Sequence, residues 1–141
     1  MRKVYLDGTV IAGTDLPESR YGHCMVQYKD EVFIIGGSKS VTEVSQYGNN
    51  LVGGNSQSIE TSIVWKMNTT DGVYIQQDSL IYPRSNHACG IIHSKAHSGR
   101  PLLVITGGIG TNPKTTEIWD FTLANSTWKL LCKYFLNIKS T

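Results

Sequence analysis

The chain has 141 residues, of which 13 are basic and 11 are acidic, so its formal net charge is only +2. So small a charge gives no long-range field that would recruit nucleic acid or an anionic membrane, and no apolar run approaches the length of a membrane span. Hydrophobic residues make up 40% of the chain and glycine occurs 14 times, a composition that favours a turn-rich globular chain over a helical one.

Ten short segments rich in strand-forming residues follow one another, separated by Gly, Asn, Asp, Ser and Pro. Helical periodicity is almost absent, and the dipeptide Asp7-Gly8 favours a two-residue hairpin turn between the first two segments. The sequence therefore predicts an all-β chain with antiparallel strands. The expected strands cover residues 3–6, 9–12, 23–28, 32–35, 63–67, 73–76, 87–93, 102–106, 117–121 and 127–131.

Two units of similar order are visible along the chain. Each contains an Arg and a His three residues apart, an apolar strand that ends in Gly-Gly, and a Trp followed nine residues later by a second aromatic residue. The anchors of the first unit are Arg20, His23, Gly36, Gly37, Trp65 and Tyr74, and those of the second are Arg84, His87, Gly107, Gly108, Trp119 and Trp128. Constant spacing within strands, with insertions between them, is typical of a repeated structural unit.

This order of anchors resembles the kelch motif, which builds one four-stranded blade of a β-propeller. The second unit is the closer match, whereas the first has a long insertion at residues 38–60 and Tyr74 in place of the closing Trp. The resemblance implies an incomplete kelch-type β-propeller of four-stranded antiparallel blades. Its expected parts are the tail of a preceding blade at 1–15, a blade at 16–79, a second blade at 80–132 and a C-terminal tail at 133–141.

Propellers expose loops at the ends of rigid blades, so the resemblance predicts a protein-interaction module, a scaffold or adaptor with no catalysis of its own. In kelch proteins that bind peptides, the residue after the Arg and the loop after Gly-Gly line one face. The resemblance carries this role to Tyr21, Ser38, Lys39, Tyr47, Ser85 and Ile109. The insertion 38–60 is expected either to contact the partner, a protein whose identity the sequence does not indicate, or to be disordered.

Two blades cannot close a ring, so an apolar face is expected to remain open at each side. Such faces favour self-association, or blades supplied by a longer parent chain. The alternative function is a fragment of a copper-radical oxidase related to galactose oxidase, a class that also uses a kelch-like propeller. The sequence marks no copper ligands, so neither a cofactor nor a metal is predicted.

The histidines and arginines are expected to be structural. Arg20, Arg84, His23 and His87 are interpreted as hydrogen-bonding groups near strand ends. His93 and His97 lie in an expected hairpin insertion without accompanying carboxylates, which favours two solvated loop side chains over metal ligands. No phosphate-binding loop or nucleophile motif is present in the sequence.

Three cysteines, Cys24, Cys89 and Cys132, match no metal or redox motif and cannot all pair within the chain. When Arg20 is aligned with Arg84, Cys24 and Cys89 are displaced by one residue, which places them on opposite faces of equivalent strands. A disulfide between them is therefore not expected, and reduced cysteines favour an intracellular chain.

Two N-glycosylation sequons, Asn68-Thr-Thr and Asn125-Ser-Thr, lie in expected turns. Asn also favours turn geometry for its own reasons, and no signal peptide is visible in the sequence. A cytoplasmic chain is therefore expected, with a secreted one as the alternative if the N-terminus is incomplete.

Overall fold

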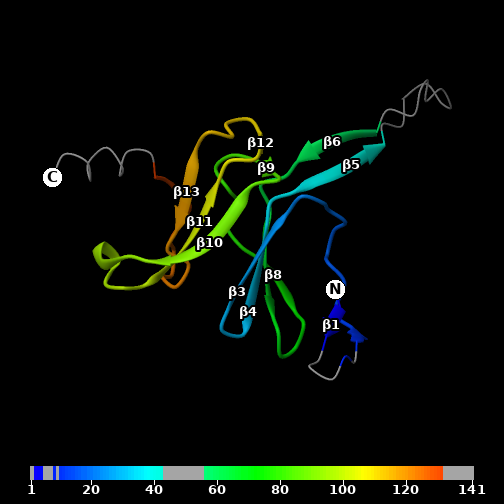
Figure 1. The fold of residues 1–141 in the computed structure, drawn as a ribbon, viewed down its shortest axis with the longest axis horizontal. Coiled ribbons are helices and arrows are strands. Elements are labelled where there is room, and N and C mark those ends of the chain that lie inside the picture. The colour runs from blue at the N-terminus through cyan, green and yellow to red at the C-terminus, as the bar shows by residue number, and fades with distance from the viewer. Residues whose placement is uncertain (1, 5–7, 9, 43–55, 132–141) are drawn as a thin grey trace.

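The computed structural model describes residues 2–4, 8, 10–42 and 56–131. This part of the chain is all-β, and its strands pair antiparallel throughout (Figure 1). The described residues contain no α-helix, only a short 3-10 turn at Lys95–His97. The described residues form no helix that is long and apolar enough to cross a membrane.

Two four-stranded sheets make up most of the described structure, each with its strands in chain order. Sheet 1 consists of β3 (Cys24–Tyr28), β4 (Glu31–Ile35), β7 (Val64–Asn68) and β8 (Tyr74–Gln76). Sheet 2 consists of β10 (Ala88–His93), β11 (Pro101–Thr106), β13 (Thr116–Trp119) and β14 (Lys129–Leu130). Neither sheet closes on itself within the described residues.

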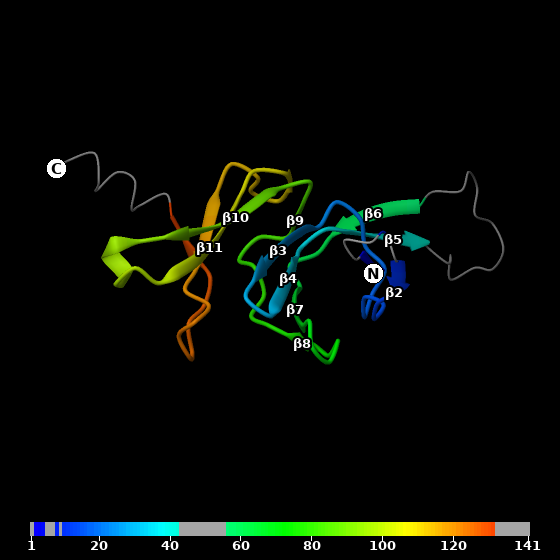
Figure 2. The same cartoon turned by 60° about the horizontal axis from the view of Figure 1, so that its bottom comes forward.

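Three two-stranded ladders accompany the sheets. β1 (Arg2–Val4) pairs with β2 (Val10–Ala12), and β5 (Ser38–Thr42) pairs with β6 (Ser56–Glu60). The third ladder joins β9 (Arg84–Ser85) to β12 (Ile109–Gly110). Figure 2 shows the β5–β6 hairpin extending away from sheet 1 on the side opposite sheet 2.

Each of the ten expected strands is present, with its described ends within two residues of the predicted ones. The insertion at 38–60 was expected either to contact a partner or to be disordered, and its two ends are ordered, because residues 38–42 and 56–60 pair in register over five positions. Residues 43–55, including the candidate Tyr47, lie outside the described part. The strands of the β5–β6 and β9–β12 ladders were not among those expected from the sequence.

Sheets 1 and 2 share one hydrophobic core. Its buried members are Phe33, Ile35 and Val64 from sheet 1, Leu80 from the connection, and Leu103, Ile105, Trp119 and Trp128 from sheet 2 and its last turn. The ring of Phe33 lies 5.9 Å from that of Trp119, centroid to centroid, in an edge-to-face arrangement. Such aromatic pairs add about 0.5–1.5 kcal/mol to the stabilisation from area burial alone.

The other face of sheet 1 forms a second, smaller core. Val32, Ile34 and Met67 are buried there because alternate residues of a strand point to opposite faces. Leu16 packs against this face, and the hydroxyl of Tyr74 donates to the backbone carbonyl of Thr14 at 3.3 Å. The segment that precedes sheet 1 therefore covers part of its outer face.

Candidate functional site

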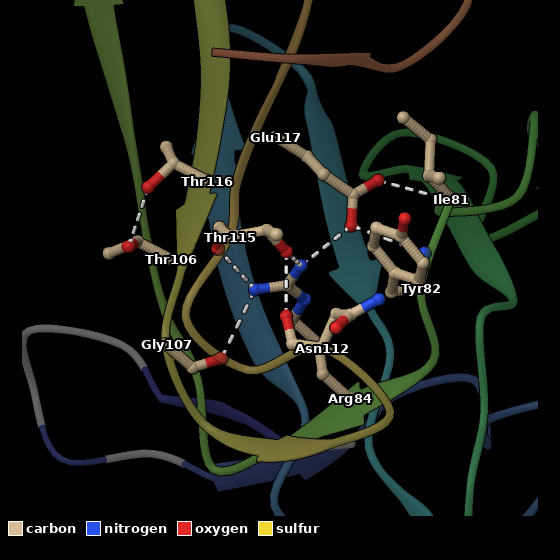
Figure 3. A network of polar contacts seen from close by, with 9 residues as sticks. All are labelled: Ile81, Tyr82, Arg84, Thr106, Gly107, Asn112, Thr115, Thr116 and Glu117. Atoms are coloured by element: carbon tan, nitrogen blue, oxygen red, sulfur yellow. Dashed lines mark hydrogen bonds and ion pairs between the residues drawn. The ribbon is translucent and has the colours of Figure 1, made fainter. Parts of the chain in front are cut away.

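The most conspicuous polar group of sheet 2 is a buried ion pair between Arg84 and Glu117 (Figure 3). Their side chains are 1% and 0% exposed, and Arg84 Nη2 lies 2.9 Å from Glu117 Oε2. Arg84 Nη1 also donates to the carbonyls of Gly107 (3.2 Å) and Thr115 (2.8 Å). Glu117 accepts from the backbone N–H of Ile81 at 2.6 Å. The pair therefore ties the incoming connection to two strand ends of sheet 2.

Sheet 1 repeats the arginine but not its partner. Arg20 Nη1 donates to the carbonyls of Gly36 (3.0 Å) and Ile63 (3.2 Å), which correspond to Gly107 and Thr115 in sheet 2. Its acidic neighbour is Glu18, whose side chain is 37% exposed and lies 3.5 Å away. The prediction that both arginines are structural hydrogen-bonding groups is confirmed for these bonds.

The arginine bonds correct the alignment of the two units. Because Ile63 corresponds to Thr115, Trp65 is the counterpart of Glu117, and Met67 is the counterpart of Trp119. Strand pairing agrees, since Trp65 lies opposite Ile34 and Glu117 lies opposite Ile105, each two residues before its Gly-Gly. Matching Trp65 to Trp119 placed the first unit two residues out of register with the second. The spacing of nine residues between aromatic residues in both units was therefore a coincidence.

His87 lies between the two sheets. It is 8% exposed, and a Cβ added at Gly36 would come within 2.8 Å of its ring and 2.7 Å of the Arg84 carbonyl oxygen. Neither ring nitrogen makes a well-formed hydrogen bond in the structure, so its expected hydrogen-bonding role is not seen. Burial first, and then the nearby positive charge of Arg84, lower the pKa of His87 to about 4, and a contact with the backbone of Ile35 opposes this shift. His87 is therefore a packing residue that is neutral near pH 7.

The candidate binding positions occupy a short ladder at the Gly-Gly end of each sheet. Tyr21 pairs with Ser38 in one unit, and Ser85 pairs with Ile109 in the other. Tyr21 and Ile109 are 50% and 57% exposed, whereas Ser38 and Ser85 are 2% and 3% exposed. The two pairs therefore occupy equivalent places in the two units. In each pair the serine is buried and its partner is exposed.

Lys39, the next candidate, forms an ion pair with Glu18, and its side chain is about one-third exposed. Of the six candidates, the structure therefore leaves Tyr21 and Ile109 as the well-exposed ones, with Lys39 partly exposed. Tyr47 lies outside the described residues.

The expectation of reduced cysteines is wrong for Cys24 and Cys89, which form a disulfide between β3 and β10. Their Cα atoms are 6.1 Å apart, a distance that a disulfide spans readily. The sequence argument was correct that the two residues occupy opposite faces of equivalent strands. The conclusion that they do not pair was wrong because sheets 1 and 2 contact each other through opposite faces. Residues that are displaced by one position in the two sheets, such as Cys24 and Cys89, therefore meet at the junction.

Three other polar residues, His93, His97 and Arg100, lie at or near the connection between β10 and β11. His93 is exposed and ends β10, and His97 lies in the 3-10 turn with its Nδ1 3.2 Å from Ser94 Oγ. Arg100 forms a two-point contact with Asp120 through Nε (3.1 Å) and Nη2 (2.8 Å). Within the described ranges, no three His, Cys, Asp or Glu side chains gather closely enough to hold a metal ion.

Compared with models of known protein families and with curated protein sequences, the chain matches neither.

Proposed function

We propose that the chain is a protein-interaction module in which sheets 1 and 2 act as two blades of a kelch-type β-propeller. Its partner binds across the Gly-Gly ends of the sheets. No catalytic step is part of this proposal.

The repeated arginine geometry supports the propeller assignment. In each sheet an arginine bonds the carbonyl of the first glycine and the carbonyl that precedes the third strand. Gly36 of sheet 1 packs against Arg84 and His87 of sheet 2, and the N–H of Gly37 donates to the Arg84 carbonyl at 2.9 Å. A stack of blades repeats one such junction between every pair of neighbours.

One observation carries the assignment to binding. At the Gly-Gly end of sheet 2, Arg84 and Glu117 are engaged with each other and with the backbone. The short ladder of each unit presents one large side chain to solvent, Tyr21 after the arginine in the first unit and Ile109 after Gly-Gly in the second. Aromatic and aliphatic side chains held on rigid strands provide contact area at little entropic cost, which is what the centre of a protein interface requires.

The test is a comparative pull-down from cells that express the protein naturally, with bound proteins quantified by mass spectrometry. The bait with Tyr21→Ala and Ile109→Ala should lose at least tenfold of the specific partner, because truncation of central apolar contacts costs about 2 kcal/mol or more. The matched control carries Ile75→Ala and Ile92→Ala. Ile75 is 56% exposed and lies midway along sheet 1, and Ile92 is 47% exposed and lies near the end of sheet 2 that is opposite its Gly-Gly end.

Equal loss from both baits, or no loss from either, contradicts the proposed surface. Circular dichroism and urea midpoints that match those of the wild type ensure that each bait is folded.

A further inference from the structure

Asn68 and Asn125 lie at or just beyond the end of the third strand in their respective sheets. Asn68 is the last residue of the third strand, β7, and Asn125 lies in the connection between the third and fourth strands, β13 and β14. Each is followed two residues later by a threonine, Thr70 or Thr127. Both asparagines and both threonines are exposed. The acceptor amide and the hydroxyl of each sequon are therefore open to an enzyme that approaches from solvent.

The local backbone places the first sequon at the last position of β7 and the turn that follows it, and the second in the β13–β14 connection. Asn68 Oδ1 accepts from the Thr70 N–H at 2.8 Å, which folds the sequon into an Asx turn. Asn125 has a φ of +62°, and the following carbonyl, that of Ser126, accepts from the Trp119 indole at 3.1 Å. Among the described residues, the structure shows no hydrogen bond from either asparagine's amide nitrogen.

The Cys24–Cys89 disulfide is an independent observation that points in the same direction. It joins two sheets across 65 residues of sequence, and both cysteines are only partly buried. A disulfide of this kind forms and persists in oxidising compartments, where thiols of the cytosol would be kept reduced. N-linked glycosylation takes place in the same kind of compartment.

We propose that Asn68 and Asn125 are N-glycosylation sites of a protein that matures in an oxidising secretory compartment. The Nδ2 atom of each asparagine forms a C–N bond to the anomeric carbon of an oligosaccharide carried on a polyprenyl pyrophosphate. The bond from that carbon to the pyrophosphate oxygen breaks, and the amide loses one proton. The two cysteine thiols lose two protons and two electrons to a disulfide donor of that compartment.

The two glycans lie away from the Gly-Gly end. Asn68 pairs with Glu31 at the β3–β4 turn, whereas the opposite end of the same ladder pairs Ile35 with Val64. Asn68 also borders a hollow together with Phe121 and Thr122, so the two sequon connections are neighbours. A second hollow of about 750 Å³, lined in part by Gln76, Phe121 and Asn125, offers polar and aromatic groups to the first sugars of a glycan on Asn125.

The experiment uses the full 141-residue chain, targeted to the endoplasmic reticulum of cultured eukaryotic cells, and the protein purified from its natural source. Peptide N-glycosidase should lower the mass of both preparations by two glycans and convert Asn68 and Asn125 to Asp. The variants Thr70→Ala and Thr127→Ala should each lose one glycan.

The chain offers matched controls, because Thr69→Ala and Ser126→Ala alter the same turns but leave the sequons intact. Both control variants should keep two glycans. Peptide mapping without reductant should recover Cys24 linked to Cys89, which shows that the tested chain is folded and oxidised. An unchanged mass after digestion of the natural protein, or free thiols at both cysteines, overturns the proposal; one occupied site overturns it for the other.

Discussion

The Gly-Gly corners of the two sheets share a backbone geometry but have different surroundings. Gly36 has a φ of +62° and faces the Arg84 carbonyl and the His87 ring of the neighbouring sheet. Gly107 has a φ of +74°, yet a Cβ there would meet no described atom within 4 Å. The glycine at the covered corner is required by close approach as well as by φ, whereas the glycine at the open corner is required by φ alone.

The faces next to these corners differ in the same sense. Phe33 and Ile35 are fully buried between the sheets, and the corresponding residues of sheet 2, Val104 and Thr106, lie on its outer face. The Thr106 hydroxyl contacts that of Thr116 at 2.8 Å. The outer face of sheet 2, which was expected to be apolar, is therefore partly polar. The face of sheet 1 that packs against sheet 2 carries larger side chains than the corresponding outer face of sheet 2.

The largest expected effect concerns the arginine partners. Replacing Glu117 with Gln should lower the free energy of unfolding by about 3–5 kcal/mol, because it leaves Arg84 charged and buried without its counterion. Glu18→Gln should cost about 1 kcal/mol or less, since its carboxylate is partly exposed. Urea unfolding followed by tryptophan fluorescence measures both values. Equal costs would mean that the backbone carbonyls alone stabilise each arginine.

The disulfide tests the same covered junction. Replacing Cys24 and Cys89 with Ala should lower the free energy of unfolding by about 2–4 kcal/mol, because the cross-link restricts the unfolded chain over 65 residues. Dithiothreitol should destabilise the wild type by a similar amount and leave the double variant unchanged. Urea midpoints with and without reductant provide the measurement, and a variant that still responds to reductant would contradict the assignment of this bridge.

The glycine corners can be compared directly. Gly107→Ala should cost about 1–2 kcal/mol, the strain of placing a side chain at positive φ. Gly36→Ala should cost at least 1 kcal/mol more, because its Cβ would also press against the Arg84 carbonyl and His87. Thermal unfolding of the two variants measures the difference. Identical melting temperatures would show that the two corners are equally open in solution.

The strands were predictable because each is a short β-rich run between turn residues, and the arginine and glycine anchors mark strand ends directly. The register of Trp65 was not predictable in this way, since a tryptophan in one unit was matched to a tryptophan in the other. The structure instead places Trp65 opposite Ile34 and gives Glu117 the corresponding position. Which residues meet across a junction depends on how whole sheets pack, and the Cys24–Cys89 bridge arises at that level.

The smallest expected effect is the pH dependence of the junction. His87 has a pKa of about 4 in the folded protein and an ordinary value near 6.5 when unfolded, so only the unfolded chain takes up a proton between these values. Stability should be unaffected by this group above about pH 6.5 and should fall as the pH decreases toward 4.

Between pH 7 and pH 5, the wild type should lose about 1–2 kcal/mol more than the His87→Gln variant, whose side chain does not titrate. Burial also lowers the pKa of His23, whose neighbour Arg20 lowers it further, so His23→Gln serves as the comparison from the other sheet. Urea unfolding at pH 7, 6 and 5 measures the three slopes. A wild-type slope equal to that of His87→Gln would place the His87 ring in contact with solvent and would contradict a closed junction between the sheets.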